Sequence, residues 1–253
     1  MIDFVGAGPG APDLITLRGA QLLKEADLVI YAGSLVNPAL LGLTRPGCRI
    51  LNSAQMDLPQ VLEALEDAEA RGQKAVRLHT GDPCLYGAIR EQIDALEARG
   101  IACRVTPGVS SFCGAAAALN AEYTLPGVSQ TVIITRMAGR TPVPAGQDIP
   151  ALAAIGATMV IFLSAGMLDK LSGQLLAGGA YTADTPAAIV YKATWPEEKV
   201  LHCTVSSLYE TAQAAGVSRT ALVLVGDFLK DAGYEKSRLY DPAFTTGYRE
   251  ARL

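Results

Sequence analysis

The stretch Val5-Gly6-Ala7-Gly8-Pro9-Gly10 follows the short apolar run Met1-Ile2-Asp3-Phe4 and decides how the first half of the chain folds. A strand that ends in a glycine-rich turn is typical of an α/β sheet whose backbone approaches a small ligand. The turn differs from a dinucleotide-binding fingerprint, because its spacing is G-x-G-x-G and its acid, Asp27, precedes the second strand instead of ending it. We therefore predict a ligand-binding loop without a nicotinamide cofactor. A tight turn that binds nothing is the alternative.

Apolar periodicity predicts alternating strands and helices over the first half of the chain. Strands are expected at residues 2–6, 28–31, 49–52, 75–79 and 101–105, and helices at 17–25, 58–71, 88–99 and 111–120. In the helix over 58–71, four apolar residues are spaced for one buried face: Val61, Leu62, Leu65 and Ala68. Alternation of this kind indicates a mainly parallel sheet covered by helices.

The pattern changes after Tyr123-Thr124-Leu125-Pro126-Gly127. Strands are expected at residues 132–135, 159–163, 187–191, 200–205 and 222–225, with a helix at 167–176. The short separation of the strands at 187–191 and 200–205 predicts an antiparallel hairpin. The chain is thus expected to be an α/β protein with an N-terminal domain at 1–123 and a mixed α/β domain at 124–253. Residues 245–253 are expected to form a loose tail.

The composition excludes several classes of protein. The 253 residues are 50% hydrophobic, yet no uninterrupted apolar run suggests a membrane span and no signal-like start is visible, so a cytoplasmic protein is expected. Five scattered cysteines fit reduced thiols, and only two histidines are present, which gives a His/Cys metal centre little support. The net charge of −4 argues against nucleic acid as the main partner.

Four predicted strands end in loops of small or hydroxyl-bearing residues: Gly6–Gly10, Thr80–Pro83, Pro107–Ser111 and Ala193–Trp195. The first loop with Asp13-Leu14-Ile15-Thr16, then RLHTGDPCLY at 77–86 and PGVSS at 107–111, resembles the tetrapyrrole methyltransferases of cobalamin and sirohaem biosynthesis. The resemblance covers almost the whole chain. It implies a two-domain fold, S-adenosylmethionine as cofactor, S-adenosylhomocysteine as product and an active site in the cleft between the domains.

The segment YAGSLV at Tyr31–Val36 resembles the members of that family that methylate C11 of precorrin-4, which gives precorrin-5. Sister enzymes that methylate another ring position or uroporphyrinogen III are the first alternative. An RNA or protein methyltransferase of the same fold and a non-catalytic nucleotide-binding module are the others. We favour a metal-free substrate over a cobalt-containing one. The macrocycle would hold any cobalt itself, so the lack of a metal-ligand cluster in the sequence does not decide between the two. The resemblance also implies a homodimer.

The resemblance implies a set of cofactor-binding residues: Pro9, through its main chain, with Thr80, Gly81, Asp82, Leu85, Ser110, Ser111, Leu163 and Ala193. Leu163 stands where most relatives carry Met, which is a volume-conserving change. For Asp82 the alternative is a turn or helix-capping acid, which the Asp-Pro dipeptide favours.

The implied substrate carries many carboxylates, so cations are expected to contact it. Arg136, Arg140 and Lys192 are candidates, with solvated surface cations as the alternative, and Tyr31 and Ser34 are candidates for the wall of the groove. No nucleophile–His–acid triad is visible, and the sequence identifies no catalytic base. Four residues are candidates for that base: Tyr31, Asp57, Tyr86 and Tyr191.

Overall fold

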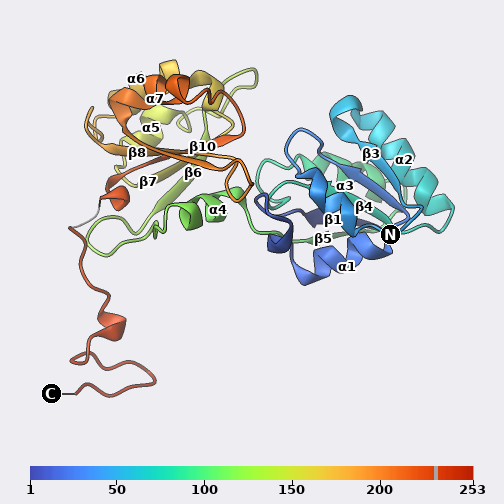
Figure 1. The fold of residues 1–253 in the computed structure, drawn as a ribbon, viewed down its shortest axis with the longest axis horizontal. Helices are drawn as coiled ribbons and strands as arrows, with labels where there is room; N and C mark the ends of the chain where they lie inside the picture. The colour runs from blue at the N-terminus through green and yellow to red at the C-terminus, as the bar shows by residue number, and fades with distance from the viewer. Residues whose placement is uncertain (231–232, 253) are drawn as a thin grey trace. The chain divides into compact units, whose positions relative to one another are not determined.

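The computed structural model describes residues 1–230 and 233–252, which form two compact units (Figure 1). Unit 1 comprises Met1–Ala118 and Lys192–Glu198, and unit 2 comprises Leu119–Tyr191 and Lys199–Leu253. The sequence placed the boundary between residues 123 and 124. The division between the units instead falls after Ala118, and it assigns the distant segment Lys192–Glu198 to unit 1. Leu253, at the end of the expected tail, lies outside the described residues.

Unit 1 is built on a five-stranded parallel sheet in the order β3-β2-β4-β1-β5. Its strands are β1 (Ile2–Gly6), β2 (Leu28–Tyr31), β3 (Arg49–Asn52), β4 (Ala75–His79) and β5 (Cys103–Thr106). Its helices are α1 (Leu17–Glu25), α2 (Leu58–Ala70), α3 (Ile89–Glu97) and α4 (Ser111–Ala118). The predicted parallel sheet with helical connections is confirmed.

Local capping explains where the first two helices begin. The Thr16 hydroxyl accepts the N–H of Gly19 at 3.1 Å at the start of α1. At the start of α2, Asp57 Oδ1 accepts the N–H of Gln60 at 2.9 Å, and Gln60 Oε1 accepts the N–H of Asp57 at 3.0 Å. Asp57 therefore caps a helix. The predicted apolar face of α2 is buried in the core.

The helices of unit 1 cover opposite faces of its sheet. Leu23 of α1 packs with Val5 and Val29 on one face, whereas α2 and α3 pack against Phe4 and Ile30 on the other. The strands β1 and β4 are adjacent in the sheet. The helix that follows β1 covers one face of the sheet, and the helix that follows β4 covers the other face. In open α/β sheets, ligands bind beyond the carboxyl ends of strands at such a switch point. The loops at Gly6–Gly10 and Thr80–Asp82 lie there.

Unit 2 contains a mixed sheet in the order β6-β7-β10-β8-β9, with β6 parallel to β7 and the other pairs antiparallel. Its strands are β6 (Val132–Arg136), β7 (Thr158–Phe162), β8 (Pro186–Tyr191), β9 (Lys199–Thr204) and β10 (Ala221–Val225). The helices α5 (Ile149–Ala153), α6 (Leu168–Ala177) and α7 (Leu208–Ala214) lie on one side of this sheet (Figure 1). The hairpin β8–β9 is confirmed.

The core of unit 2 lies between that sheet and its helices. Met159 and Ile161 of β7 pack there with Leu171 of α6 and Leu208 of α7.

Short 3-10 helices lie at Pro12–Leu14, Pro38–Leu43, Ser53–Gln55, Ala165–Met167, Val205–Ser207, Asp227–Leu229 and Arg238–Tyr240. Among the described residues, no helix has both the length and the apolar character that a membrane span needs.

Candidate functional site

Three glycines bring the loops after β1, β4 and β5 into main-chain contact. A Cβ atom on Gly6 would lie 2.6 Å from Gly108 Cα and 2.7 Å from Gly81 O. A Cβ atom on Gly108 would lie 2.2 Å from Gly81 O. Real side chains do not tolerate such distances, so the close approach of these loops requires glycine at these positions.

The loops after β1 and β4 are also joined by hydrogen bonds. Gly8 N donates to Gly81 O at 3.2 Å, and Gly81 N donates to Gly8 O at 2.8 Å. Both glycines have positive φ, +80° at Gly8 and +58° at Gly81. A Cβ atom on Gly81 would lie 3.3 Å from Ser111 N and 3.4 Å from Ser110 Cα. The structure thus brings together Gly81, Ser110 and Ser111, three of the residues that the resemblance assigns to the cofactor.

Asp82 connects two of these loops through both of its carboxylate oxygens. Oδ1 accepts the N–H of Cys84 at 2.8 Å, and Oδ2 accepts the N–H of Gly108 at 2.9 Å. Burial acts to raise the pKa of Asp82, but the hydrogen bonds from Cys84 and Gly108 outweigh burial and lower it. Leu85 completes this turn, its N–H donating to Asp82 O at 3.3 Å. The proposed alternative role of Asp82, a turn acid, is therefore present in the structure, and Asp82 also fixes the loop after β5.

The segment Lys192–Glu198 adds a fourth loop to unit 1. Trp195 Nε1 donates to Pro9 O at 3.3 Å, and Ala11 N donates to the Thr194 hydroxyl at 2.9 Å. A Cβ atom on Gly10 would lie 2.0 Å from Trp195 Cδ1 and 2.8 Å from Ala193 O. Pro9 and Ala193, both predicted from the resemblance, therefore lie in loops that contact each other.

Left-handed backbone at non-glycine residues is concentrated in and next to the predicted ligand loops. Tyr86 and Ala88 follow the Thr80–Pro83 loop with φ of +55° and +49°, and Lys192 and Thr194 have φ of +47° and +68°. Such conformations cost on the order of 1–3 kcal/mol each and gather at functional sites. Four of the seven non-glycine residues with positive φ among those described lie in or near these two loops, which supports a ligand-binding role.

Leu163 follows β7 in unit 2 and shows the same combination of strain and exposure. Its φ is +53°, and its side chain is 60% exposed. An apolar side chain held outside the core by a left-handed backbone is consistent with a residue that contacts a ligand. Leu163, Arg136, Arg140 and the candidate base Tyr191 belong to unit 2, whereas the other predicted site residues belong to unit 1.

Two buried polar atoms next to these loops have no hydrogen-bond partner: His79 Nε2, directly before Thr80, and Thr106 Oγ1, directly before Pro107. Burial, and secondarily the charge of Arg77, lower the pKa of His79 to about 3, so its imidazole is neutral at physiological pH. Unpaired buried polar atoms are costly and are expected to gain a partner when a ligand or water is bound. These atoms and the glycine-lined loops fit a small ligand recognised through main-chain contacts.

The YAGSLV segment and the residue directly after it are hydrogen-bonded to two of the loops that the resemblance assigns to the cofactor. The Thr80 hydroxyl donates to Leu35 O at 3.3 Å, and Asn37 Nδ2, just after the segment, donates to Gly10 O at 2.9 Å. Tyr31 ends β2, and its carbonyl accepts the Ser53 hydroxyl at 3.1 Å. Ser34 is exposed. Thr80, predicted to contact the cofactor, thus also positions this segment.

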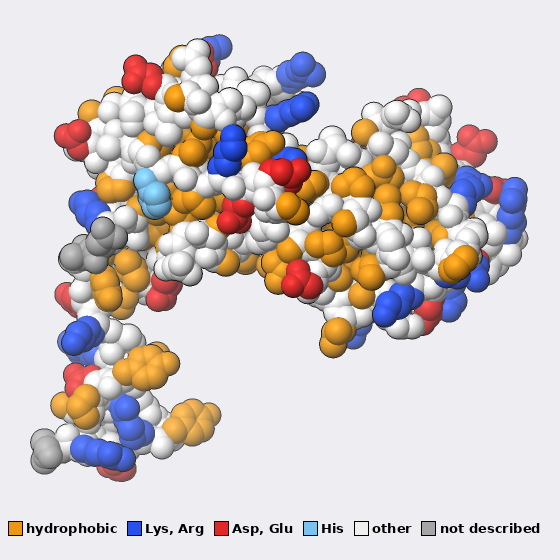
Figure 2. Space-filling model, viewed as in Figure 1, with side chains coloured by type: hydrophobic (Ala, Val, Ile, Leu, Met, Phe, Trp, Pro, Cys, Tyr) orange, Lys and Arg blue, Asp and Glu red, His pale blue; other side chains and the backbone are white. Residues whose placement is uncertain are grey.

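The candidate substrate cations differ in their surroundings. Arg136 donates to three carbonyls of its own loop, those of Met137 at 3.1 Å, Thr141 at 3.2 Å and Pro142 at 2.8 Å. Lys192 lies 3.4 Å from Glu197 and 4.8 Å from the centroid of the Trp195 ring. Arg140 is exposed. Figure 2 shows basic and acidic side chains interspersed on the face drawn, so that face carries no large field of one sign.

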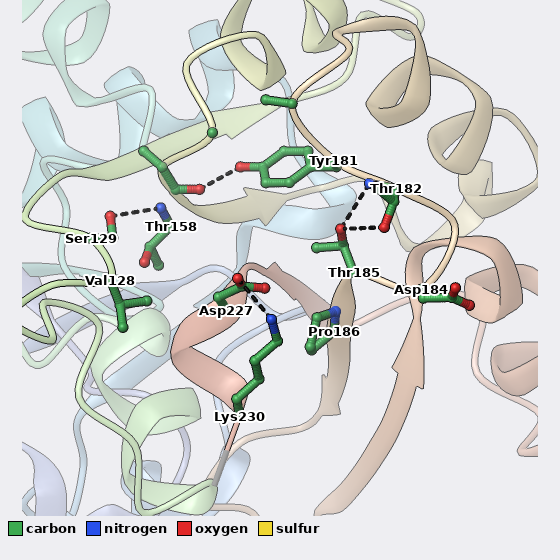
Figure 3. Close-up of a pocket in the computed structure, with 13 residues that line it drawn as sticks. Val128, Ser129, Thr158, Tyr181, Thr182, Asp184, Thr185, Pro186, Asp227 and Lys230 are labelled. Atoms are coloured by element: carbon green, nitrogen blue, oxygen red, sulfur yellow. Dashed lines mark hydrogen bonds and ion pairs between the residues drawn. The ribbon is translucent and has the colours of Figure 1, made fainter. Parts of the chain in front are cut away.

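A cavity of about 500 Å³ lies in unit 2, and none of the predicted site residues lines it. Figure 3 shows several of its polar side chains paired with one another or with the backbone. Lys230 Nζ lies 2.9 Å from Asp227 Oδ2, the Thr182 and Thr185 hydroxyls lie 3.3 Å apart, and the Tyr181 hydroxyl donates to Ala157 O. The cavity borders Thr158, the first residue of β7. Leu163 directly follows the last residue of the same strand.

The sequence did not single out Asn37 or Trp195 as contacts of the glycine-rich loop. Their hydrogen bonds to Gly10 O and Pro9 O span 27 and 186 residues of chain. The only local signal was the Ala193-Thr194-Trp195 loop at a strand end. Pairing over such separations leaves no periodic pattern in the sequence.

The chain is similar to known proteins over nearly its whole length. A cobalt-precorrin-4 C(11)-methyltransferase of Methanocaldococcus jannaschii is 48% identical over 99% of this chain and 96% of its own length. A precorrin-4 C(11)-methyltransferase of Mycobacterium tuberculosis is 44% identical over 96% of each chain.

Two solved structures share the fold. A cobalt precorrin-4 methyltransferase superposes with a TM-score of 0.87 at 43% identity, over 90% of this chain and 95% of that one. A uroporphyrin-III C-methyltransferase of Thermus thermophilus, complexed with S-adenosylhomocysteine, has a TM-score of 0.75 at 27% identity, over 90% of this chain and 93% of that one. The model of the tetrapyrrole (corrin/porphyrin) methylases matches residues 1–209. The chain belongs to this family of methyltransferases.

Proposed function

We propose that this protein transfers a methyl group from S-adenosylmethionine to C11 of precorrin-4, giving precorrin-5 and S-adenosylhomocysteine in cobalamin biosynthesis. The observation that carries the proposal is the hydrogen bond from the Thr80 hydroxyl to Leu35 O, which joins the YAGSLV segment to the loop after β4, while Asn37, directly after the segment, donates to Gly10 O. That segment carries the resemblance to C11 enzymes. The relatives named above, which match nearly the whole chain, support the same assignment.

We assign the cofactor to the loops of Pro9, Thr80–Asp82, Leu85, Ser110–Ser111 and Ala193, with Leu163 from unit 2. S-Adenosylmethionine supplies an electrophilic methyl group on a cationic sulfonium. Main-chain carbonyls and the Asp82 carboxylate, whose pKa is lowered, suit a cationic group. The cofactor complex of the Thermus thermophilus relative supports this assignment.

Methyl transfer from S-adenosylmethionine requires little of the protein beyond the positioning of the two reactants. Holding two reactants in line and excluding water supplies on the order of 7–11 kcal/mol in the best cases. The rigid glycine contacts among the three loops suit this task, since they leave the main chain little freedom to move. We do not assign the role of catalytic base to Asp57, because its carboxylate caps α2.

We assign the groove wall to Tyr31 and Ser34 and the carboxylate contacts to Arg140 and Lys192. Arg136 is assigned a second role, since its guanidinium already binds three carbonyls of the 137–142 loop. It orders the loop that carries Arg140, and its remaining donors are available to a substrate carboxylate.

The experiment incubates the full chain with S-adenosylmethionine and, separately, metal-free precorrin-4, cobalt-precorrin-4 and uroporphyrinogen III. Both precorrin-4 forms are needed because relatives named for each match at 48% and 44% identity. Mass spectrometry should show one added methyl group on a precorrin-4 form and an equal amount of S-adenosylhomocysteine. Methylation of uroporphyrinogen III alone would move the assignment to a sister enzyme. No methyl transfer to any of the three would overturn it.

We further infer from the family resemblance that the protein acts as a homodimer in the cytoplasm. Sedimentation equilibrium of the full chain measures its mass in solution directly. Twice the mass of the 26.4 kDa chain is expected, and the mass of one chain would contradict the proposal.

A further inference from the structure

Three successive residues of the glycine-rich loop are held through their main-chain atoms by side chains from elsewhere in unit 1. Pro9 O accepts the indole N–H of Trp195, Gly10 O accepts the amide of Asn37, and Ala11 N donates to the Thr194 hydroxyl. The corresponding distances are 3.3, 2.9 and 2.9 Å. The loop contains no side chain of its own that makes such bonds, since Pro9, Gly10 and Ala11 carry only apolar groups or hydrogen.

Trp195 also packs against this loop. A Cβ atom on Gly10 would lie 2.0 Å from Trp195 Cδ1 and 2.3 Å from Nε1, so the indole occupies the space that a side chain at position 10 would fill. Lys192 Nζ lies 4.8 Å from the centroid of the same ring. The ring therefore contacts the backbone of Gly10 and lies close to an ammonium group, and both contacts favour a fixed ring orientation.

The segment 192–198, which we call the latch, has its own internal order. Trp195 N donates to Lys192 O at 3.0 Å, Glu198 N donates to Trp195 O at 3.0 Å, and Glu198 Oε2 accepts the N–H of Thr194 at 2.6 Å. Lys192 and Thr194 have positive φ. Strain of this kind persists only where surrounding contacts over-determine the conformation. The latch joins β8 to β9 of unit 2 but belongs to unit 1.

We propose that Trp195 is a positioning residue, and that with Thr194 and Asn37 it holds the main chain of Pro9–Ala11 in the conformation that binds the methyl donor. This inference rests on the proposed function. A carbonyl oxygen has two lone pairs, so Pro9 O retains one for a ligand while the indole N–H fixes its direction. Cofactor affinity then depends on a segment that lies 186 residues from Pro9.

The test measures the binding of S-adenosylhomocysteine by calorimetry to the full chain and three variants. Trp195→Phe keeps a ring against Gly10 but removes the N–H, Thr194→Val keeps the shape but removes the hydroxyl, and Thr194→Ser restores a hydroxyl. One hydrogen bond contributes about 0.5–1.5 kcal/mol, so the first two variants should raise Kd about two- to twelvefold. Thr194→Ser should bind more tightly than Thr194→Val. Tyr209→Phe, which changes an exposed aromatic residue of α7, is the matched control and should bind as the unchanged protein does.

Two further readouts separate positioning from a loss of stability. Trp195 is the single tryptophan of the chain, so its fluorescence in the unchanged protein should respond to S-adenosylhomocysteine with the Kd found by calorimetry. In Trp195→Phe the KM for S-adenosylmethionine should rise while kcat at saturating cofactor changes less than twofold. This fluorescence needs no variant and remains informative if a variant does not fold.

The outcomes distinguish the two claims. If the unchanged protein binds S-adenosylhomocysteine but Trp195→Phe and Thr194→Val bind it equally well, the positioning role is wrong and the proposed function stands. If the fluorescence of Trp195 does not change at a saturating concentration of S-adenosylhomocysteine, the positioning role is also wrong. If the unchanged protein does not bind S-adenosylhomocysteine, the cofactor assignment itself fails, and the positioning role fails with it.

Discussion

The Asp82 carboxylate accepts the N–H of Gly108 at 2.9 Å, across 26 residues of chain, and so ties the loop after β4 to the loop after β5. Its other oxygen accepts the N–H of Cys84 within its own turn. A single side chain thereby fixes the relative position of two loops that we assign to the cofactor. This arrangement makes Asp82 a sharper test of the site than a residue that contacts only a ligand.

Asp82→Ala should weaken the binding of S-adenosylhomocysteine at least tenfold, because both loops lose a hydrogen-bond acceptor. Asp148→Ala is the matched control, since Asp148 Oδ1 also accepts a main-chain N–H, that of Ala151 at 2.9 Å, at the start of α5 in unit 2. Each change should cost about 0.5–2 kcal/mol of stability. Calorimetry should show an altered Kd for Asp82→Ala alone, and equal Kd values for the two variants would contradict the account.

Gly8→Ala and Gly47→Ala separate backbone strain from loss of the ligand loop. Both residues have similar left-handed φ, +80° and +83°, so both substitutions should cost roughly 1–2 kcal/mol of stability. A Cβ atom on Gly8 would also lie 2.8 Å from Leu14 O, whereas one on Gly47 would meet nothing within 4 Å. Binding of S-adenosylhomocysteine should fall for Gly8→Ala only. Unchanged binding in that variant would mean that the loop is only a tight turn.

Ser34→Phe tests the YAGSLV segment. The exposed position of Ser34 lets the larger ring project without disturbing the core, so thermal stability should change little. Turnover with precorrin-4 should fall at least a hundredfold, while S-adenosylhomocysteine binds as before. Both quantities are measured on one preparation. Loss of both would place the segment at the cofactor, and loss of neither would remove it from the substrate site.

His79→Leu should reduce the acid sensitivity of the fold. The folded-state pKa of His79 is about 3, below its ordinary value of 6.5. Between those values the unfolded chain binds a proton at this residue and the folded chain does not, so stability is lost as pH falls from 6.5 toward 3. The loss is on the order of a few kcal/mol. Urea unfolding at pH 7, 5 and 4 should show the variant gaining relative stability as pH falls. A constant difference in stability between the two proteins would contradict the lowered pKa of His79.

Local sequence signals were sufficient for the parallel sheet and for most strand positions. Glycine-rich strand ends and the spacing of apolar residues in α2 act within a few residues. Asp57 was a candidate base in the sequence, whereas the structure shows it capping α2. α5 and α7 were missed because they span 5 and 7 residues, too few for a helical period to show.

The contacts that assemble the site were not predictable from local patterns. The Asp82–Gly108, Trp195–Pro9 and Asn37–Gly10 bonds join residues far apart in the chain. In addition, some side chains have a role that differs from the one expected of them. Asp82 was expected to contact the cofactor or to act as a turn acid, and its bond to Gly108 belongs to neither expectation. Arg136 was expected at the substrate, yet its guanidinium binds the carbonyls of its own loop.

The most direct test of the proposed function locates the transferred methyl group. The full chain is incubated with precorrin-4, in the form that it accepts, and with S-adenosylmethionine that carries a ¹³C-labelled methyl group. The purified product is then examined by ¹³C NMR. The account predicts a single labelled methyl group bonded to C11 of the macrocycle. A label on any other ring carbon would contradict it.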